Sequence, residues 1–210
     1  MDFWTTVRTL MKRWRIALPV HVFSLAMAAT VFFLVSTQYE STGTLVLTSS
    51  ASGARTGTQS AGKINPLLAF DGSLTTTAQI VIETLKDPAN QKKYETADGA
   101  PAGYEAGNGQ LSGPFIVVVA TATSPEAARQ TAVSVLDLAR QELADRQKAL
   151  QAPESTYIRA DPVVNPTAGK AKYGPKIRYA AVALVLTFGV SLIVIFALAS
   201  YYNHRRPQAS

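Results

Sequence analysis

The chain has 210 residues, of which 47% are hydrophobic and only 16% are charged. A net charge of +6 could indicate nucleic-acid binding, but many of the basic residues flank two apolar stretches instead of forming one surface, which argues against that class. The absence of cysteine excludes disulfides and thiolate metal sites. These totals predict one ordinary domain together with membrane anchors.

The first apolar stretch predicts a retained membrane anchor. Residues 16–39 contain no Asp, Glu, Lys or Arg, and about 20 apolar residues suffice for a helix to cross the hydrocarbon core. The stretch is longer than the apolar region of a secretion signal, and no small-x-small cleavage site ends it. Four basic residues precede it and the next one is Arg55. We therefore expect residues 1–15 in the cytoplasm and a transmembrane helix at residues 16–37.

His21 is the ionisable side chain of this stretch. It could belong to a proton relay, because ionisable residues inside a membrane often do. No carboxylate accompanies it in the stretch, however. We therefore favour a neutral imidazole near the headgroups or in a helix–helix hydrogen bond.

The segment after this anchor opens with a strand, a loop and a helix. β-Branched residues and leucines alternate in residues 39–49, which predicts a strand. Residues 50–62 are rich in Ser, Gly, Ala and Thr and predict a loop. Apolar side chains at helical spacing in residues 74–86 predict a helix, with Asp71 or Ser73 as its N-cap.

The clearest strand of the chain follows an irregular segment. Residues 98–113 are interrupted by Gly and Pro and predict at most a short strand near Tyr104. The continuous apolar run in residues 114–123 predicts a strand that is buried on both faces or contacts another copy of the chain.

A long helix and a last strand complete the domain. Ser124 and Pro125 are a typical helix start, and apolar periodicity extends the helix to about Leu150. Residues 155–164 predict a strand, and residues 165–175 predict an irregular connector. The order strand, helix, one or two strands, long helix, strand predicts a ferredoxin-like α+β domain with both helices on one face of the sheet.

A second apolar stretch predicts a second anchor. Residues 179–202 contain no charged side chain, so we expect an extracytoplasmic domain at residues 38–175, a transmembrane helix at residues 176–201 and a cytoplasmic tail at residues 202–210. The basic residues beside this stretch alone would leave its orientation ambiguous or inverted. Because the first helix usually dominates, we expect a two-pass protein of the plasma membrane with both termini in the cytoplasm.

The sequence lacks the side-chain pattern of an enzyme. Its two histidines, His21 and His204, lie outside the predicted domain, so the usual general base is missing there. The carboxylates lack the spacing of a calcium loop. The pair Gly169-Lys170 lacks the other residues of a phosphate loop. We therefore expect a binding or scaffolding protein without catalytic residues, bound metal or cofactor.

Several segments resemble a known family. They are residues 1–4 (Met-Asp-Phe-Trp), 39–42 (Tyr-Glu-Ser-Thr), 65–74 (Asn-Pro-Leu-Leu-Ala-Phe-Asp-Gly-Ser-Leu) and 139–143 (Ala-Arg-Gln-Glu-Leu), with the Pro-containing connector before the second anchor. Together they resemble the Wzz-type polysaccharide chain-length determinants, or polysaccharide co-polymerases, in particular short-domain, actinobacterial-like members. The resemblance covers most of the chain, and its motifs are structural, not catalytic.

The resemblance implies a ring of several copies in the plasma membrane. Such a ring regulates, without enzymatic activity, the length of capsule, exopolysaccharide or cell-wall glycan chains made by a membrane polymerase, and the glycan itself is a further candidate partner. The long helix, of about 26 residues, is too short to build the tall external part of long-helix members. We expect the apolar strand and the long helix to form the contacts of a homo-oligomer, through Phe115, Val117, Val119, Leu136 and Leu143.

Two alternatives stay open at this stage. The chain could be the membrane adaptor or activator of a separate bacterial tyrosine kinase. Its docking tail would then contain Tyr201, Tyr202, Arg205 and Arg206. It could instead be a receptor or a structural subunit of an envelope complex, which composition does not exclude.

Overall fold

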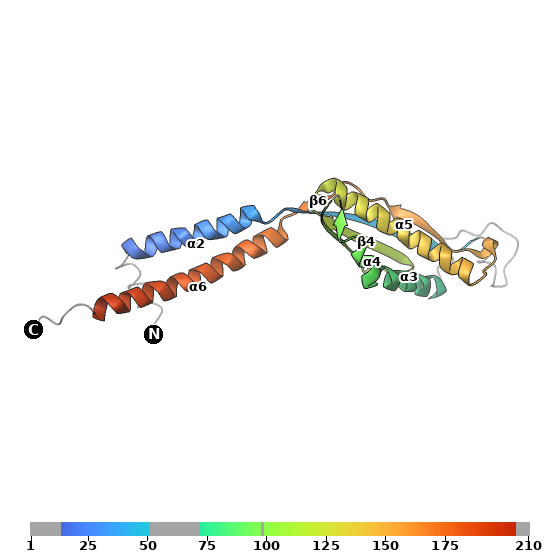
Figure 1. Cartoon of the computed structure of the whole chain (residues 1–210). Helices are drawn as coiled ribbons and strands as arrows, with labels where there is room; N and C mark the ends of the chain where they lie inside the picture. The colour runs from blue at the N-terminus through green and yellow to red at the C-terminus, as the bar shows by residue number, and fades with distance from the viewer. Residues whose placement is uncertain (1–13, 51–71, 98, 205–210) are drawn as a thin grey trace, which may run out of the picture. The chain divides into compact units, whose positions relative to one another are not determined.

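The chain divides into two compact units. The helical unit comprises Met1–Thr37 and Tyr173–Ser210, and the sheet unit comprises Gln38–Lys172. The expected loop at residues 50–62 and the expected cytoplasmic segment at residues 1–15 lie almost wholly outside the described part of the chain. The computed structural model (Figure 1) describes residues 14–50, 72–97 and 99–204.

The helical unit consists of two helices that pack side by side (Figure 1). They are α2 (Trp14–Leu34) and α6 (Gly174–His204). Within α6, Gly174–Ile195 is long and apolar enough to cross a membrane, whereas the apolar part of α2, Leu18–Leu34, is shorter. The described residues therefore contain one helix of spanning length, where the sequence predicts two.

The sheet unit contains one antiparallel sheet. Its order is β2-β3-β4-β1-β5, and β6 also pairs with β1. β1 is the longest strand and pairs with β4 on one side and with both β5 and β6 on the other. The strands are β1 (Gln38–Thr48), β2 (Thr96–Ala97), β3 (Ala100–Gly107), β4 (Phe115–Ala122), β5 (Arg159–Val164) and β6 (Lys170–Lys172).

The helices of the sheet unit cover one face of this sheet. They are α3 (Gly72–Leu85), the short α4 (Pro88–Lys92) and α5 (Pro125–Ala149), and a 3-10 turn, η3 (Glu154–Thr156), precedes β5. Apolar side chains of α3 and α5 pack against every second residue of the strands, so that the core lies between the helices and the sheet. Its fully buried members include Leu45, Leu47, Leu74, Val81, Leu85, Ile116, Val118 and Val135.

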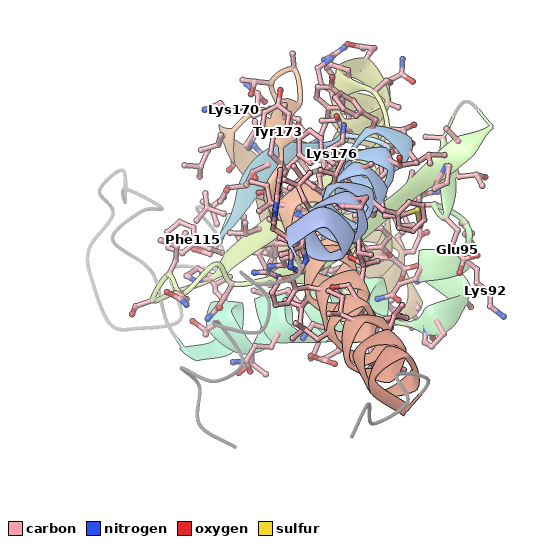
Figure 2. All side chains as sticks on the ribbon, turned by 90° about the vertical axis from the view of Figure 1, so that its left-hand side faces the viewer. Lys92, Glu95, Phe115, Lys170, Tyr173 and Lys176 are labelled. Atoms are coloured by element: carbon pink, nitrogen blue, oxygen red, sulfur yellow. The ribbon has the colours of Figure 1, made fainter. Side chains whose placement is uncertain are left out.

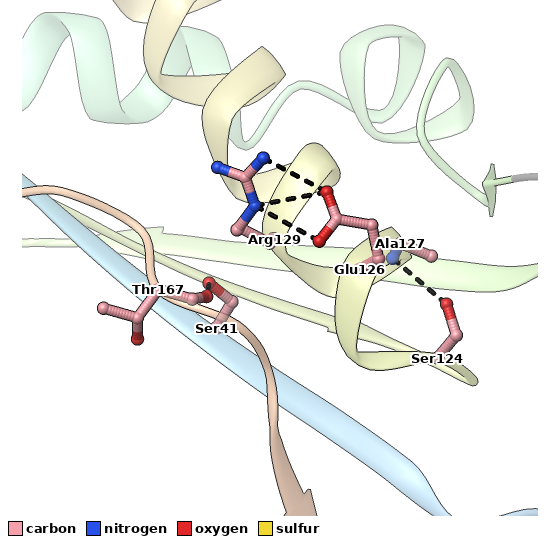
Figure 3. A network of polar contacts seen from close by, with 6 residues as sticks. All are labelled: Ser41, Ser124, Glu126, Ala127, Arg129 and Thr167. Carbon is pink, nitrogen blue, oxygen red and sulfur yellow. Dashed lines mark hydrogen bonds and ion pairs between the residues drawn. The ribbon is translucent and has the colours of Figure 1, made fainter.

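The long helix begins as the sequence predicts. The Ser124 hydroxyl accepts a hydrogen bond from the Ala127 N–H at 3.1 Å, and Pro125 occupies the first helical position (Figure 3). This cap satisfies one of the N–H groups that the first turn leaves without a partner. The N-cap expectation for the first helix of the sheet unit was wrong for Ser73, because α3 already begins at Gly72. Asp71 lies outside the described residues.

A mixed α/β domain is confirmed, but three strands differ from the sequence-based expectation. β3 is eight residues long and not short, because its pairing with β4 from Ala102 to Gly107 holds it extended in spite of two glycines and Pro101. β6 lies inside the connector that was expected to be irregular. The last strand begins at Arg159, after the η3 turn, instead of near residue 155. Pro162 is tolerated in β5 because an edge strand has one side without ladder bonds.

Candidate interaction surface

The two faces of β4 have different surroundings. Ile116, Val118 and Ala120 are completely buried beneath the helices. The alternate residues Phe115 and Val117, like Val119, are half-buried on the opposite face. The apolar run is therefore not buried equally on both sides within the described part of the chain. Its outer side chains form an apolar surface on the face that α3 and α5 leave free.

Neighbouring strands extend this surface. In the register of β1 with β4, Thr42, Thr44 and Val46 lie opposite Val119, Val117 and Phe115. Val164 of β5 lies opposite Thr44, and 47% of its surface is exposed. Thr44 and Val46 are themselves only 7% and 5% exposed. The accessible residues on this side are therefore Thr42, Phe115, Val117, Val119 and Val164, which we call the open sheet face. Apolar side chains at its centre make it a candidate contact surface for another protein.

The turn between β3 and β4 rests against this face. Gly109 and Gly113 both have positive φ angles, 62° and 119°, which residues other than glycine rarely adopt. A Cβ atom on Gly109 would lie 2.7 Å from Cγ2 of Val117. One on Gly113 would lie 3.2 Å from the Phe115 ring. The turn therefore needs glycine both for its backbone conformation and for its close approach to the two side chains.

The predicted subunit-contact residues separate into two groups. Phe115, Val117 and Val119 come together on the open sheet face. Leu136 and Leu143 lie on the other side of the sheet, in the core, and each is only 3% exposed. Side chains that are already buried in their own domain leave almost no surface for a second copy. The apolar periodicity of the helix signals its core-facing side, which is why sequence reasoning selected these two leucines.

A segment between β5 and β6 packs against both β1 and α5. The Ser41 hydroxyl donates a hydrogen bond to the Thr167 carbonyl at 2.8 Å (Figure 3), and the Gly169 N–H donates to the Pro125 carbonyl at 3.0 Å. A Cβ atom on Gly43 would lie 2.5 Å from Leu136 Cδ1 and 2.8 Å from Pro166 Cγ. We call residues 165–169 the strap. Sequence reasoning missed it, although a glycine inside a strand such as Gly43 is a recognised sign of close backbone approach.

The strap leads into β6, which closes the sheet unit. Gln38 and Glu40 of β1 lie opposite Lys172 and Lys170 of β6. The Lys172 ammonium forms an ion pair with the carboxylate of Glu40, its diagonal neighbour in this strand pair. The first strand of the unit and its last are therefore neighbours, and the two connections to the helical unit leave from paired strands.

A buried tyrosine on β3, towards the opposite edge of the sheet, connects the sheet to the helices. The Tyr104 hydroxyl donates a hydrogen bond to the Leu85 carbonyl at 2.5 Å, and the Tyr94 ring packs edge-on at 5.6 Å. Burial, with smaller effects of Tyr94 and Asp87, raises the pKa of Tyr104 to about 12. The phenol therefore stays protonated and keeps donating at physiological pH.

Polar side chains join the two helices of the helical unit. The Ser24 hydroxyl lies 3.3 Å from the Thr187 carbonyl of α6. The His21 ring stacks on Phe188 at 5.0 Å, and its Nδ1 is buried without a hydrogen-bond partner among the described residues. His21 thus contacts the other helix through its ring, whereas a hydrogen bond was one expectation. The Lys176 ammonium lies 5.0 Å from the centre of the Phe32 ring and 3.3 Å from the Thr37 hydroxyl.

Chemistry at the remaining predicted positions is limited. No group of three or more His, Cys, Asp or Glu side chains in the described ranges is placed to hold a metal ion. The backbone of Tyr201 and Tyr202 belongs to α6, but their side chains are outside what the structure describes. Arg205 and Arg206 lie beyond the described residues. The docking tail stays a prediction.

Comparisons with known proteins show a similarity in fold. No family model matches the sequence, and no curated protein matches it. Among solved structures, a full-length bacterial polysaccharide co-polymerase matches with a TM-score of 0.51 and 11% sequence identity. The match covers 98% of this chain and 100% of that one. The chain therefore shares its overall fold with a polysaccharide co-polymerase, both helices included.

Proposed function

We propose that this chain regulates the length of a surface polysaccharide without being an enzyme, as a homo-oligomeric co-polymerase of the short-domain Wzz type. The observation that carries the proposal is the full-length likeness in fold to a bacterial polysaccharide co-polymerase. The polysaccharide would be a capsule, an exopolysaccharide or a cell-wall glycan.

We further propose a two-pass topology in the plasma membrane, with both termini in the cytoplasm and the sheet unit outside. Four basic residues before the first apolar stretch support this orientation. α6 has the length and composition of a spanning helix, and α2 packs against it in the same unit. On α2, large exposed apolar side chains such as Phe23 and Phe33 would contact the lipid.

The sheet unit is best described as a ferredoxin-like domain in this proposal. Its main elements follow one another as β1, α3, β3, β4, α5 and β5, which is the β-α-β-β-α-β sequence of that motif. The order of these strands in the sheet is β3-β4-β1-β5, so β1 and β4 occupy the centre and the two helices cross on one face. β2 and β6 are additions at the edges.

Copies of the chain would assemble through the open sheet face. Phe115, Val117 and Val119 are half-buried there, and Val164 extends the apolar surface towards the sheet edge. A membrane polysaccharide polymerase, and the glycan that it extends, are the partners that this function requires. A separate tyrosine kinase that docks on the tail is compatible with the same architecture.

Deleting the gene and sizing the surface polysaccharide tests the proposed function. We expect the narrow length distribution of the wild type to become broad or to move to shorter chains, and the wild-type gene to restore it. Total polysaccharide should change less than its length distribution, because the polymerase itself is still present. An unaltered length distribution in the deletion strain would show that the proposed function is incorrect.

A further inference from the structure

The first turns of α6 carry a cation that the helical unit does not neutralise. Arg178 is exposed, and none of the ion pairs among the described residues involves it. The described parts of the unit, residues 14–37 and 173–204, contain no Asp or Glu. A second copy that packs its helices alongside cannot supply a carboxylate from these parts either. An anionic partner for Arg178, where one binds, comes from outside these helices.

The position of Arg178 along α6 determines how deep in a membrane an anionic partner would lie. It is the fifth residue of Gly174–Ile195, the apolar segment of spanning length. With a rise of about 1.5 Å per residue, it lies roughly 6 Å from the first residue of this segment. An arginine near the end of a spanning helix extends its guanidinium towards the headgroups, where lipid phosphates lie. Tyr179 and Tyr173 are 60% and 54% exposed on either side, as is typical of the interface between lipid and water.

Lys176 is different, although it is only two residues away. Its ammonium is engaged inside the unit by the Phe32 ring and the Thr37 hydroxyl, and it is half-buried (labelled in Figure 2). Its charge therefore holds α6 against α2. Lys176 and Arg178 carry the same charge within one turn of helix, but only Lys176 is engaged by the described side chains of the helical unit.

We propose that Arg178 binds the phosphate of an anionic phospholipid of the surrounding leaflet. The guanidinium can donate two parallel hydrogen bonds to phosphate oxygens, which gives the contact a geometry that a diffuse charge lacks. This role also explains why a basic residue flanks α6 on the side where the proposed topology disfavours it. The inference requires that α6 spans a membrane, and it is independent of the glycan.

Native mass spectrometry of the full chain in a neutral detergent tests this lipid contact. The protein is incubated with phosphatidylglycerol or with phosphatidylcholine, and retained lipids are counted per protomer. We expect phosphatidylglycerol to be retained preferentially, and Arg178→Gln to lower its retention about fivefold, the factor expected for one basic residue near an anionic surface. Lys176→Gln removes the same charge and should change retention less than twofold. Arg178→Lys should fall between Arg178→Gln and the wild type.

Several outcomes would overturn the inference. An equal loss in Lys176→Gln and Arg178→Gln would indicate diffuse electrostatic attraction. Equal retention of the two phospholipids would exclude recognition of net negative charge. Displacement of phosphatidylglycerol by an equimolar polyprenyl diphosphate would identify a lipid carrier as the ligand instead. If Arg178→Gln does not fold, as judged by its melting curve, the Arg178→Lys variant decides, because it keeps the charge but loses the paired donors of the guanidinium. Glycan length is not measured here, so failure leaves the proposed function untouched.

Discussion

At the scale of single residues, glycines mark the places where the backbone of the sheet unit approaches other atoms most closely. A Cβ atom on Gly169 would lie 3.0 Å from the Pro125 carbonyl oxygen, 3.0 Å from Tyr39 Cβ and 3.1 Å from Ala128 Cβ. None of these atoms is the free end of a flexible side chain. A methyl group at this position must therefore move the strap, the helix start or β1.

We expect Gly169→Ala to destabilise the sheet unit by about 1–3 kcal/mol, as overpacking in a close-packed region does. Gly103→Ala is the matched control, because the nearest atom to its Cβ is the Thr121 hydroxyl at 3.9 Å. Its effect should stay within about 0.5 kcal/mol. Urea unfolding of both full-length variants in the same detergent measures the difference. Equal unfolding midpoints would contradict the close packing of the strap.

At the scale of elements, substitutions in β4 can separate effects on folding from effects on assembly, because adjacent residues of this strand face opposite sides of the sheet. Val118 points into the core and is completely buried, whereas Val119 is half-buried on the open sheet face. The same substitution at the two positions therefore has different consequences. A lysine at the first would bury a charge, but one at the second can extend its ammonium to water.

We expect Val119→Lys to reduce the oligomer to smaller species while its melting temperature changes little, at a cost of about 1 kcal/mol or less. Val118→Lys should unfold the domain. Mass photometry of detergent-solubilised full-length protein gives the assembly state, and circular dichroism gives the melting temperature. An intact oligomer in Val119→Lys would remove the open sheet face from the proposed subunit contact.

The predictable elements are those whose signals are local. α5 starts at a Ser-Pro pair and runs on apolar periodicity, so its bounds follow from the sequence to within one residue. β4 was expected from its apolar run, but only the packing of helices on one face shows which side chains stay accessible. β6 could not be predicted, because a three-residue strand exists only through its pairing with the distant β1. The apolar periodicity of α5 marks Leu136 and Leu143 but does not reveal that the sheet of the same chain covers them, so their place in the core could not be predicted.

At the scale of the whole molecule, both connections between the two units arise from one strand pair. Gln38 follows the helical unit directly, and its register partner Lys172 directly precedes the return to it. Because the chain has no cysteine, two engineered cysteines report on this pairing without interference.

We expect the double variant Gln38→Cys/Lys172→Cys to form an intramolecular disulfide almost completely on mild oxidation, because register partners in an antiparallel pair lie within bonding range. The control Gln38→Cys/Arg159→Cys should not, since Arg159 pairs with Thr48 at the far end of β1, about 33 Å away. Thiol titration before and after oxidation measures both. Disulfide-linked dimers in place of the intramolecular bond would contradict the pairing of β1 with β6.

Pairing of the first and last strands also determines how the sheet unit responds to mechanical load. If α2 and α6 are pulled apart, tension reaches the sheet through Gln38 and Lys172, two adjacent ends of an antiparallel pair. Such a pair is loaded in the unzipping direction, so its backbone hydrogen bonds yield one after another and not all together. The Lys172–Glu40 ion pair lies at the front of this peeling. Sideways strain between the helices would therefore detach β6 first, while the remainder of the sheet keeps its shape.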